Sequence, residues 1–399
     1  MAERCSASTL DPAYVDRAQT KPVEHTLTTT PTVSVELAAK FASEKDSVYE
    51  RWIRSQGLDI VPAHYIPNLR TVELKPWARR GGRGVYINHE ASRTTIDCYV
   101  CEIAAGKHLE PQRMLFEEMI LILDGRGSTT VWNNAGQRIT FEWQAGAIFA
   151  IPLNCWHQHF NGSGRELVRY VAVTNAPPFV NLFEDTDFLL GCPHDFKGRF
   201  SGEPDYFSSK GEQKGFLLTA NMVPDAVNLP LHESKERGAG SGHIRFNMAR
   251  GSLPSHISQF PIGTYKKAHH HGPGAHVVVL SGEGYSLMWP QGEEPRYYPW
   301  EVGTMIVPPN GWYHQHFNTG PTPARYLAFK PGNSPRNSQG VPMSWISRRA
   351  GGNQIDYADE TAAVRSRFAD ALAKHGLSPR MDASYAKEAE TLPPKVAAE

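Results

Sequence analysis

Three histidines in the C-terminal half of the chain, His269, His271 and His314, have the residue type and the spacing of metal ligands. His269 and His271 form a His-x-His pair, and residues two apart on a β-strand point to the same face. Neutral imidazole is a good ligand for Fe, Zn, Cu and Ni. Each histidine alone fits a solvated turn or a buried structural position better, but the three together predict a metal site.

The stretch that carries these histidines is one of two copies of an internal repeat. An offset of 157 residues relates the copies without a gap, and WHQHFN at 156–161 is nearly identical to YHQHFN at 313–318. The paired residues include Gly106 and Gly263, Gly125 and Gly282, Trp132 and Trp289, Gly146 and Gly303, Pro152 and Pro309, and Asn161 and Asn318. Apolar segments between glycine-rich turns in each copy indicate two similar antiparallel β-barrels.

Both copies resemble the cupin family. The second copy has a glycine, five residues and His-x-His, then a second glycine, five residues, a proline, a histidine and an asparagine. These positions are Gly263, His269, His271, Gly303, Pro309, His314 and Asn318. The resemblance covers roughly residues 90–175 and 245–332. It implies an all-β fold of two tandem cupin barrels, each a double-stranded β-helix or jelly roll.

The sequence around these barrels predicts helical extensions and connections. The expected segments are an N-terminal arm and helix at 1–89, a first barrel at 90–175, a connection at 176–244, a second barrel at 245–332, and a C-terminal helix and tail at 333–399. Apolar spacing places one helix at 34–57 and another near 359–375. We expect residues 1–33 to be a loose arm and the chain from Leu377 to be a mobile tail.

The cupin motifs imply four ligand positions in each barrel, three for histidine and one for glutamate. In the first barrel these positions hold Gln112, Met114, Glu118 and His157. An amide binds a divalent metal weakly and a thioether is a soft ligand. We therefore expect the first barrel to be a degenerate copy without a strong metal site.

In the second barrel the glutamate position is occupied by Ala275, so the resemblance implies a site of three histidines. His276 is an additional candidate ligand. A step of one residue along a strand points His276 to the opposite face, and a bulge at 272–274 would be needed to turn it inward.

Candidate substrate-handling residues follow from strand parity and proximity. His316 has the same parity as His314 and is a candidate catalytic acid or base, because imidazole titrates near neutral pH. Arg245, Tyr265 and Lys267 lie on segments expected near the barrel mouth and are candidates to bind a carboxylate. A surface or structural role is the alternative for each of these three.

Because its ligand set lacks the glutamate, the second barrel resembles the three-histidine Fe(II) cupin dioxygenases, of which gentisate 1,2-dioxygenase is an example. This resemblance implies an Fe(II) site that binds a small substrate and O2 together and cleaves a C–C bond of a hydroxylated aromatic acid or β-dicarbonyl. In many of those bicupins the N-terminal barrel carries the metal, unlike here. The alternatives are a non-redox isomerase, lyase or decarboxylase that uses Zn, Ni or Mn, and a ligand-binding module without catalysis.

Composition limits the partners. The chain has 41 Lys and Arg and 41 Asp and Glu, and this balance gives no support for binding to nucleic acid or to a membrane surface. The N-terminal sequence lacks the apolar core of a signal peptide, so we expect a cytoplasmic protein. The resemblance to cupins, which commonly assemble, implies a homo-oligomer. Cys98 and Cys101 form a C-x-x-C on an expected strand, where they would face opposite sides as small buried residues.

Overall fold

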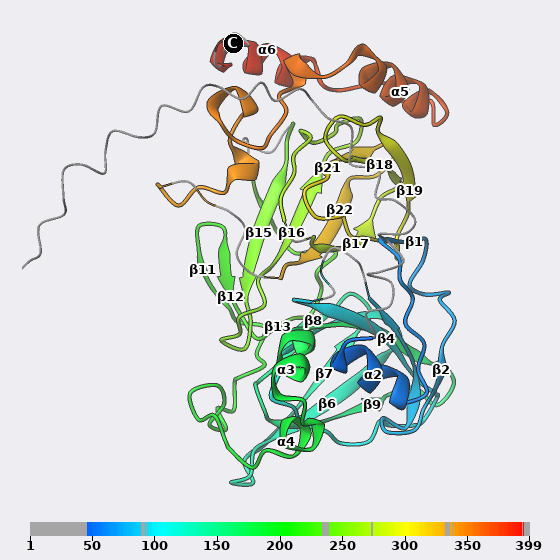
Figure 1. Cartoon of the computed structure of the whole chain (residues 1–399), viewed down its shortest axis with the longest axis vertical. Helices are drawn as coiled ribbons and strands as arrows, with labels where there is room; N and C mark the ends of the chain where they lie inside the picture. The colour runs from blue at the N-terminus through cyan, green and yellow to red at the C-terminus, as the bar shows by residue number, and fades with distance from the viewer. Residues whose placement is uncertain are drawn as a thin grey trace, which may run out of the picture. The chain divides into compact units, whose positions relative to one another are not determined.

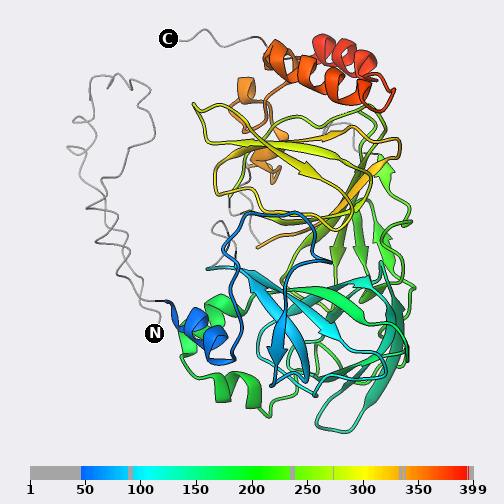
Figure 2. The same ribbon diagram turned by 90° about the vertical axis from the view of Figure 1, so that its right-hand side faces the viewer.

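The structure, a computed structural model, describes residues 46–394 except 89–91, 93, 234–238, 273, 332–335, 337 and 393. The arm expected at 1–33 and the first part of the helix expected at 34–57 lie outside these residues. The described part of the chain is mainly β-structure, with short helices around it (Figures 1 and 2). It contains no helix that is long and apolar enough to cross a membrane.

The first barrel, barrel 1, consists of a large sheet and a small sheet. The large sheet has the order β13 (Met222–Val223), β8 (Ile148–Ile151), β5 (Glu118–Asp124), β10 (Val168–Thr174), β4 (Asp97–Ile103), β3 (Gly82–Ile87) and β2 (Lys75–Trp77). The small sheet has the order β7 (Arg138–Gln144), β6 (Arg126–Trp132) and β9 (Trp156–Asn161). All of these strand pairs are antiparallel.

Barrel 2 repeats this arrangement. Its large sheet has the order β1 (Tyr65–Ile66), β20 (Met305–Ile306), β17 (His276–Ser281), β22 (Ala324–Phe329), β16 (Ser255–Phe260), β15 (Gly242–Asn247), β12 (Leu217–Thr219) and β11 (Glu212–Lys214), and β14 (His232–Glu233) also pairs with β15. Its small sheet is β19 (Arg296–Trp300), β18 (Gly284–Trp289) and β21 (Tyr313–Asn318). The predicted all-β fold of two similar tandem barrels is confirmed.

The pairing register of the small sheets follows the repeat. His157 lies opposite Val131 in barrel 1, and His314 lies opposite Met288 in barrel 2. The two pairs are related by the same offset of 157 residues. The repeat therefore fixes which side chains of β9 and β21 face the barrel interior.

Buried side chains on both faces of the large sheets hold the barrels together. On β4, Tyr99 and Cys101 belong to the core inside barrel 1, whereas Cys98 and Val100 belong to a second core. That second core also contains Leu327 of β22, so it joins residues of both barrels. The two-sided burial explains why β5 reads as a continuous apolar run.

Short helices extend the barrels at both ends of the described chain. Helix α2 (Val48–Ser55) begins with a capping box between Ser47 and Glu50, and it packs on α3 (Ala176–Phe183), which α4 (Thr186–Gly191) follows. Three 3₁₀ turns, η3 (Met343–Trp345), η4 (Arg348–Ala350) and η5 (Tyr357–Asp359), lead to α5 (Ala362–Ala373) and α6 (Asp382–Thr391).

The expectation of a mobile tail from Leu377 is wrong, because α6 follows α5. The reason is a core shared with barrel 2: Phe368, Leu372 and Met381 pack with Leu287 and Phe317 of the small sheet. In Figure 1 both helices lie over the upper end of barrel 2. The sequence of α6 has little apolar periodicity, so this docking was not evident from the pattern alone.

Candidate metal centre

The three predicted histidines meet inside barrel 2. His269, His271 and His314 each offer a ring nitrogen, and these atoms lie within 4.8 Å of one another. The ring centroids of His269 and His314 are 4.2 Å apart, and that of His271 is 4.9 Å from His314. His269 and His314 are buried, and His271 is half-buried.

Backbone pairing positions two of these rings. His269 and His314 form an antiparallel bridge in which each amide donates to the carbonyl of the other, at 3.1 and 2.9 Å. The Nδ1 atom of His269 lies 3.2 Å from the Lys267 carbonyl, and Nδ1 of His314 lies 3.3 Å from the Trp312 carbonyl. An Nδ1–H that donates to a carbonyl leaves Nε2 as the metal-binding atom. The donor set therefore fits a divalent first-row metal.

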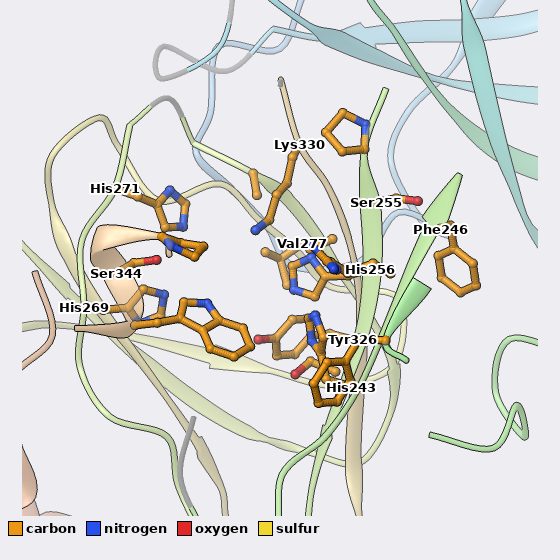
Figure 3. Close-up of a pocket in the computed structure, with 18 of the residues that line it drawn as sticks. His243, Phe246, Ser255, His256, His269, His271, Val277, Tyr326, Lys330 and Ser344 are labelled. Carbon is orange, nitrogen blue, oxygen red and sulfur yellow. The ribbon is translucent and has the colours of Figure 1, made fainter. Parts of the chain in front are cut away.

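The histidines open onto a cavity of about 580 Å³. Arg245, Lys330 and Arg336 line it, and no Asp or Glu does so among the described residues. Figure 3 shows Lys330 reaching towards the space between His271 and His256. A cavity with several cationic groups and without carboxylates favours a negatively charged ligand.

His316 lines the same cavity. Its Nδ1 atom lies 2.7 Å from Ser286 Oγ, and its ring is 5.7 Å from that of His314. The equivalent residue in barrel 1, His159, makes the same contact with Thr129, also at 2.7 Å. The contact is therefore a feature of both barrels, whereas only His316 stands beside the three-histidine cluster.

The structure places the other predicted substrate residues differently. Arg245 lines the cavity, but Tyr265 and Lys267 do not. Tyr265 is buried and donates to Glu360 at 2.6 Å. Lys267 pairs with Asp356 at 3.1 Å and also with Glu388 of α6.

An irregular backbone explains this difference. The segment before His269 joins β21 through isolated bridges rather than a continuous strand, so alternation does not hold along it. Lys266, and not Lys267, points into the barrel, where it is buried against Ser258 and lies 3.3 Å from the Tyr326 hydroxyl. Strand parity therefore gave the wrong lysine.

His276 does not join the three-histidine cluster. It is fully buried, and its ring lies in a separate group with Asp97 and Cys98 of barrel 1. Ala275 takes the position on the cavity wall instead. The bulge that would have turned His276 towards the other histidines falls at 272–274, and residue 273 lies outside the described residues.

The equivalent position in barrel 1 holds a network of hydrogen bonds. Gln112 and His157 form the same mutual bridge, and their Nε2 atoms are 3.1 Å apart. Tyr99 donates to Glu118 at 2.5 Å, and a guanidinium nitrogen of the buried Arg80 is 3.9 Å from the same carboxylate. Burial lowers the pKa of His157 to about 3, so its ring is neutral at physiological pH.

Several cavity residues were missed from the sequence. His243 of β15, and His256 and Ser258 of β16, alternate with the buried residues Ile244 and Ile257, as does the predicted Arg245. This polar alternation was a readable signal. Trp345 and Ser344 come from η3, beyond the barrel, and no local pattern indicates that this turn closes the cavity.

Comparisons with known proteins show similarity to solved structures only. No family model matches the chain, and no curated protein matches it. Solved structures with similarity include a deletion mutant of Bacillus subtilis oxalate decarboxylase, at 13% identity and a TM-score of 0.45, which covers 68% of this chain and 78% of that chain. A tryptophan-to-phenylalanine variant of the same enzyme matches at 12% identity with the same TM-score and coverage. A likeness this distant says nothing about the metal or the substrate.

Proposed function

We propose that this protein is a metal-dependent enzyme that acts on a small, oxygen-rich anion, and that it is an Fe(II)-dependent dioxygenase that cleaves a C–C bond. The observation that carries the proposal is the three-histidine cluster at the wall of a cavity whose described lining residues include cationic side chains and no carboxylate. His269, His271 and His314 would hold the metal.

The charge balance favours an anionic substrate. Three neutral imidazoles leave the charge of a divalent ion uncompensated, and Arg245 and Lys330 add positive charge to the same cavity. A divalent charge beside the buried rings of His269 and His314 is costly unless an opposite charge accompanies it. A substrate with a carboxylate or enolate next to a second oxygen supplies that charge and can chelate the metal.

The residues around the cluster would then have distinct tasks. When bound, Fe(II) supplies coordination positions for two substrate oxygens and for O2. Arg245 and Lys330 orient the carboxylate. Ser286 holds Nδ1 of His316, so that Nε2 is the atom that exchanges a proton with the substrate. The apolar surface of Val277 and Trp345 excludes water from one side of the cavity.

Anaerobic purification followed by metal analysis and oxygen-electrode assays tests this proposal. Hydroxybenzoates and β-dicarbonyl compounds are the first substrates to try. We expect one iron per chain in the wild type, none in His269→Ala, and normal iron in the matched barrel 1 variant Gln112→Ala. Turnover without O2 uptake, with Mn, Zn or Ni bound, would instead assign a non-redox lyase, isomerase or decarboxylase. Ligand binding without turnover would assign a binding module.

A further inference from the structure

We propose a second metal site, between the two barrels, formed by Asp97, Cys98 and His276. It would bind a thiophilic cation such as Zn²⁺ and tie barrel 1 to barrel 2. This site is separate from the three-histidine cluster, and the proposal does not depend on the function proposed above.

Geometry gives the first support. The carboxylate of Asp97, the thiol of Cys98 and the imidazole of His276 lie within 4.8 Å of one another. The Sδ atom of Met305 is 3.7 Å from Cys98 Sγ and borders the group from barrel 2. All four residues are fully buried. Thiolate, imidazole and carboxylate are the side-chain ligands that bind Zn²⁺ in proteins.

The position in the fold gives the second support. Asp97 and Cys98 begin β4 of barrel 1, whereas His276 begins β17 and Met305 begins β20 of barrel 2. Cys98 and Met305 belong to the apolar core that both barrels share. A carboxylate, a thiol and an imidazole are costly to gather in such a core, and one shared cation would compensate all three.

Two hydrogen bonds hold the Asp97 carboxylate in place, as hydrogen bonds from neighbouring residues do for carboxylates that bind metals. The Tyr49 hydroxyl of α2 donates to one oxygen of Asp97 at 2.9 Å. The Cys98 amide donates to the other oxygen at 2.8 Å. Each carboxylate oxygen keeps a second lone pair with which it could bind a cation, and hydrogen bonds of this kind typically hold metal-binding carboxylates in place.

The C-x-x-C pair itself is not the site. Cys101 faces the core inside barrel 1, away from the core that contains Cys98. Cys101 is equally buried and lies on the same strand. It therefore provides a matched control for any effect of removing a buried thiol.

The test begins with a His269→Ala/His314→Ala protein, in which the first cluster is removed. We expect this full-length protein to bind one Zn²⁺ per chain. Adding Cys98→Ser or His276→Gln should abolish that binding, and adding Cys101→Ser should not. With Co²⁺ as the probe, a near-ultraviolet thiolate-to-cobalt charge-transfer band should appear; it should be lost in Cys98→Ser and in His276→Gln and kept in Cys101→Ser.

Thermal unfolding provides a second measurement, because a structural metal stabilises the folded state. Zn²⁺ should raise the Tm of the double variant and of its Cys101→Ser derivative, and it should leave the Tm unchanged when Cys98 or His276 is replaced. If Cys98→Ser does not fold, Asp97→Asn, of nearly identical shape, replaces it. The proposal is overturned if the double variant binds neither Zn²⁺ nor Co²⁺. It is also overturned if metal binding survives each of the substitutions Cys98→Ser, His276→Gln and Asp97→Asn.

Discussion

His269 and His314 face each other across an antiparallel bridge, with their backbone amides donating to each other's carbonyls and their ring centroids 4.2 Å apart. Gln112 and His157 form the same bridge in barrel 1. The backbone of the site is thus present twice, and side-chain identity decides which copy can hold a metal. For each variant at the site, the equivalent substitution in barrel 1, 157 residues earlier, serves as a control.

Replacing His314 with Ala should remove the metal from barrel 2. Only two of the three imidazoles would remain. Replacing a residue that merely hydrogen-bonds to a metal ligand can lower metal affinity by up to about 100-fold, so we expect the loss of a ligand to lower it by at least about 100-fold. Metal content after dialysis measures the effect. The matched barrel 1 variant His157→Ala should keep its metal, and equal loss in both variants would contradict the assignment of the site to barrel 2.

Replacing Lys330 with Met should weaken binding of an anionic substrate. A hydrogen bond to a charged group contributes about 1.5–3 kcal/mol, so we expect KM to rise about 10- to 100-fold with little change in kcat. Steady-state kinetics at two salt concentrations would show this. Arg296→Ala, which removes a surface arginine paired with Glu293, should leave KM unchanged. A neutral ligand that binds the Lys330 variant normally would strengthen the electrostatic interpretation.

Replacing His316 with Gln should lower kcat about 100-fold, because acid–base groups typically contribute that much or more. The pH profile of kcat should lose one limb. His159→Gln removes the equivalent ring in barrel 1, where the same hydroxyl contact exists, and it should affect stability but not the pH profile. An unchanged profile in His316→Gln would leave this residue with a structural role only.

Glu360 should make stability depend on pH. Burial raises its pKa from 4.5 to about 7, although Tyr265 and Gln315 donate hydrogen bonds to it. The folded state therefore keeps a proton that the unfolded state releases. The free energy of unfolding should fall as pH rises from about 4.5 to about 7, by at most about 1.4 kcal/mol per pH unit.

Urea unfolding of the wild type and of Glu360→Gln across this range checks the effect. The glutamine variant cannot ionise at this position, so its unfolding free energy should fall less between these pH values. Parallel curves for the two proteins would show that Glu360 ionises with an ordinary pKa.

The sequence by itself determined the two barrels and the three-histidine cluster. This was possible because the repeat fixes equivalent strands, and strand parity fixes which side chains share a face. The cluster of His269, His271 and His314 also needed the His-x-His spacing and the resemblance to the cupin motifs.

Tertiary structure decided the rest. Lys266, and not the predicted Lys267, points into barrel 2 because the segment before His269 is not a regular strand. Trp345 closes the cavity from a turn that local patterns do not place. His276 meets Asp97 and Cys98 only because two large sheets pack face to face. Contacts between elements far apart in the chain depend on packing, and the periodicity of a single segment does not contain that information.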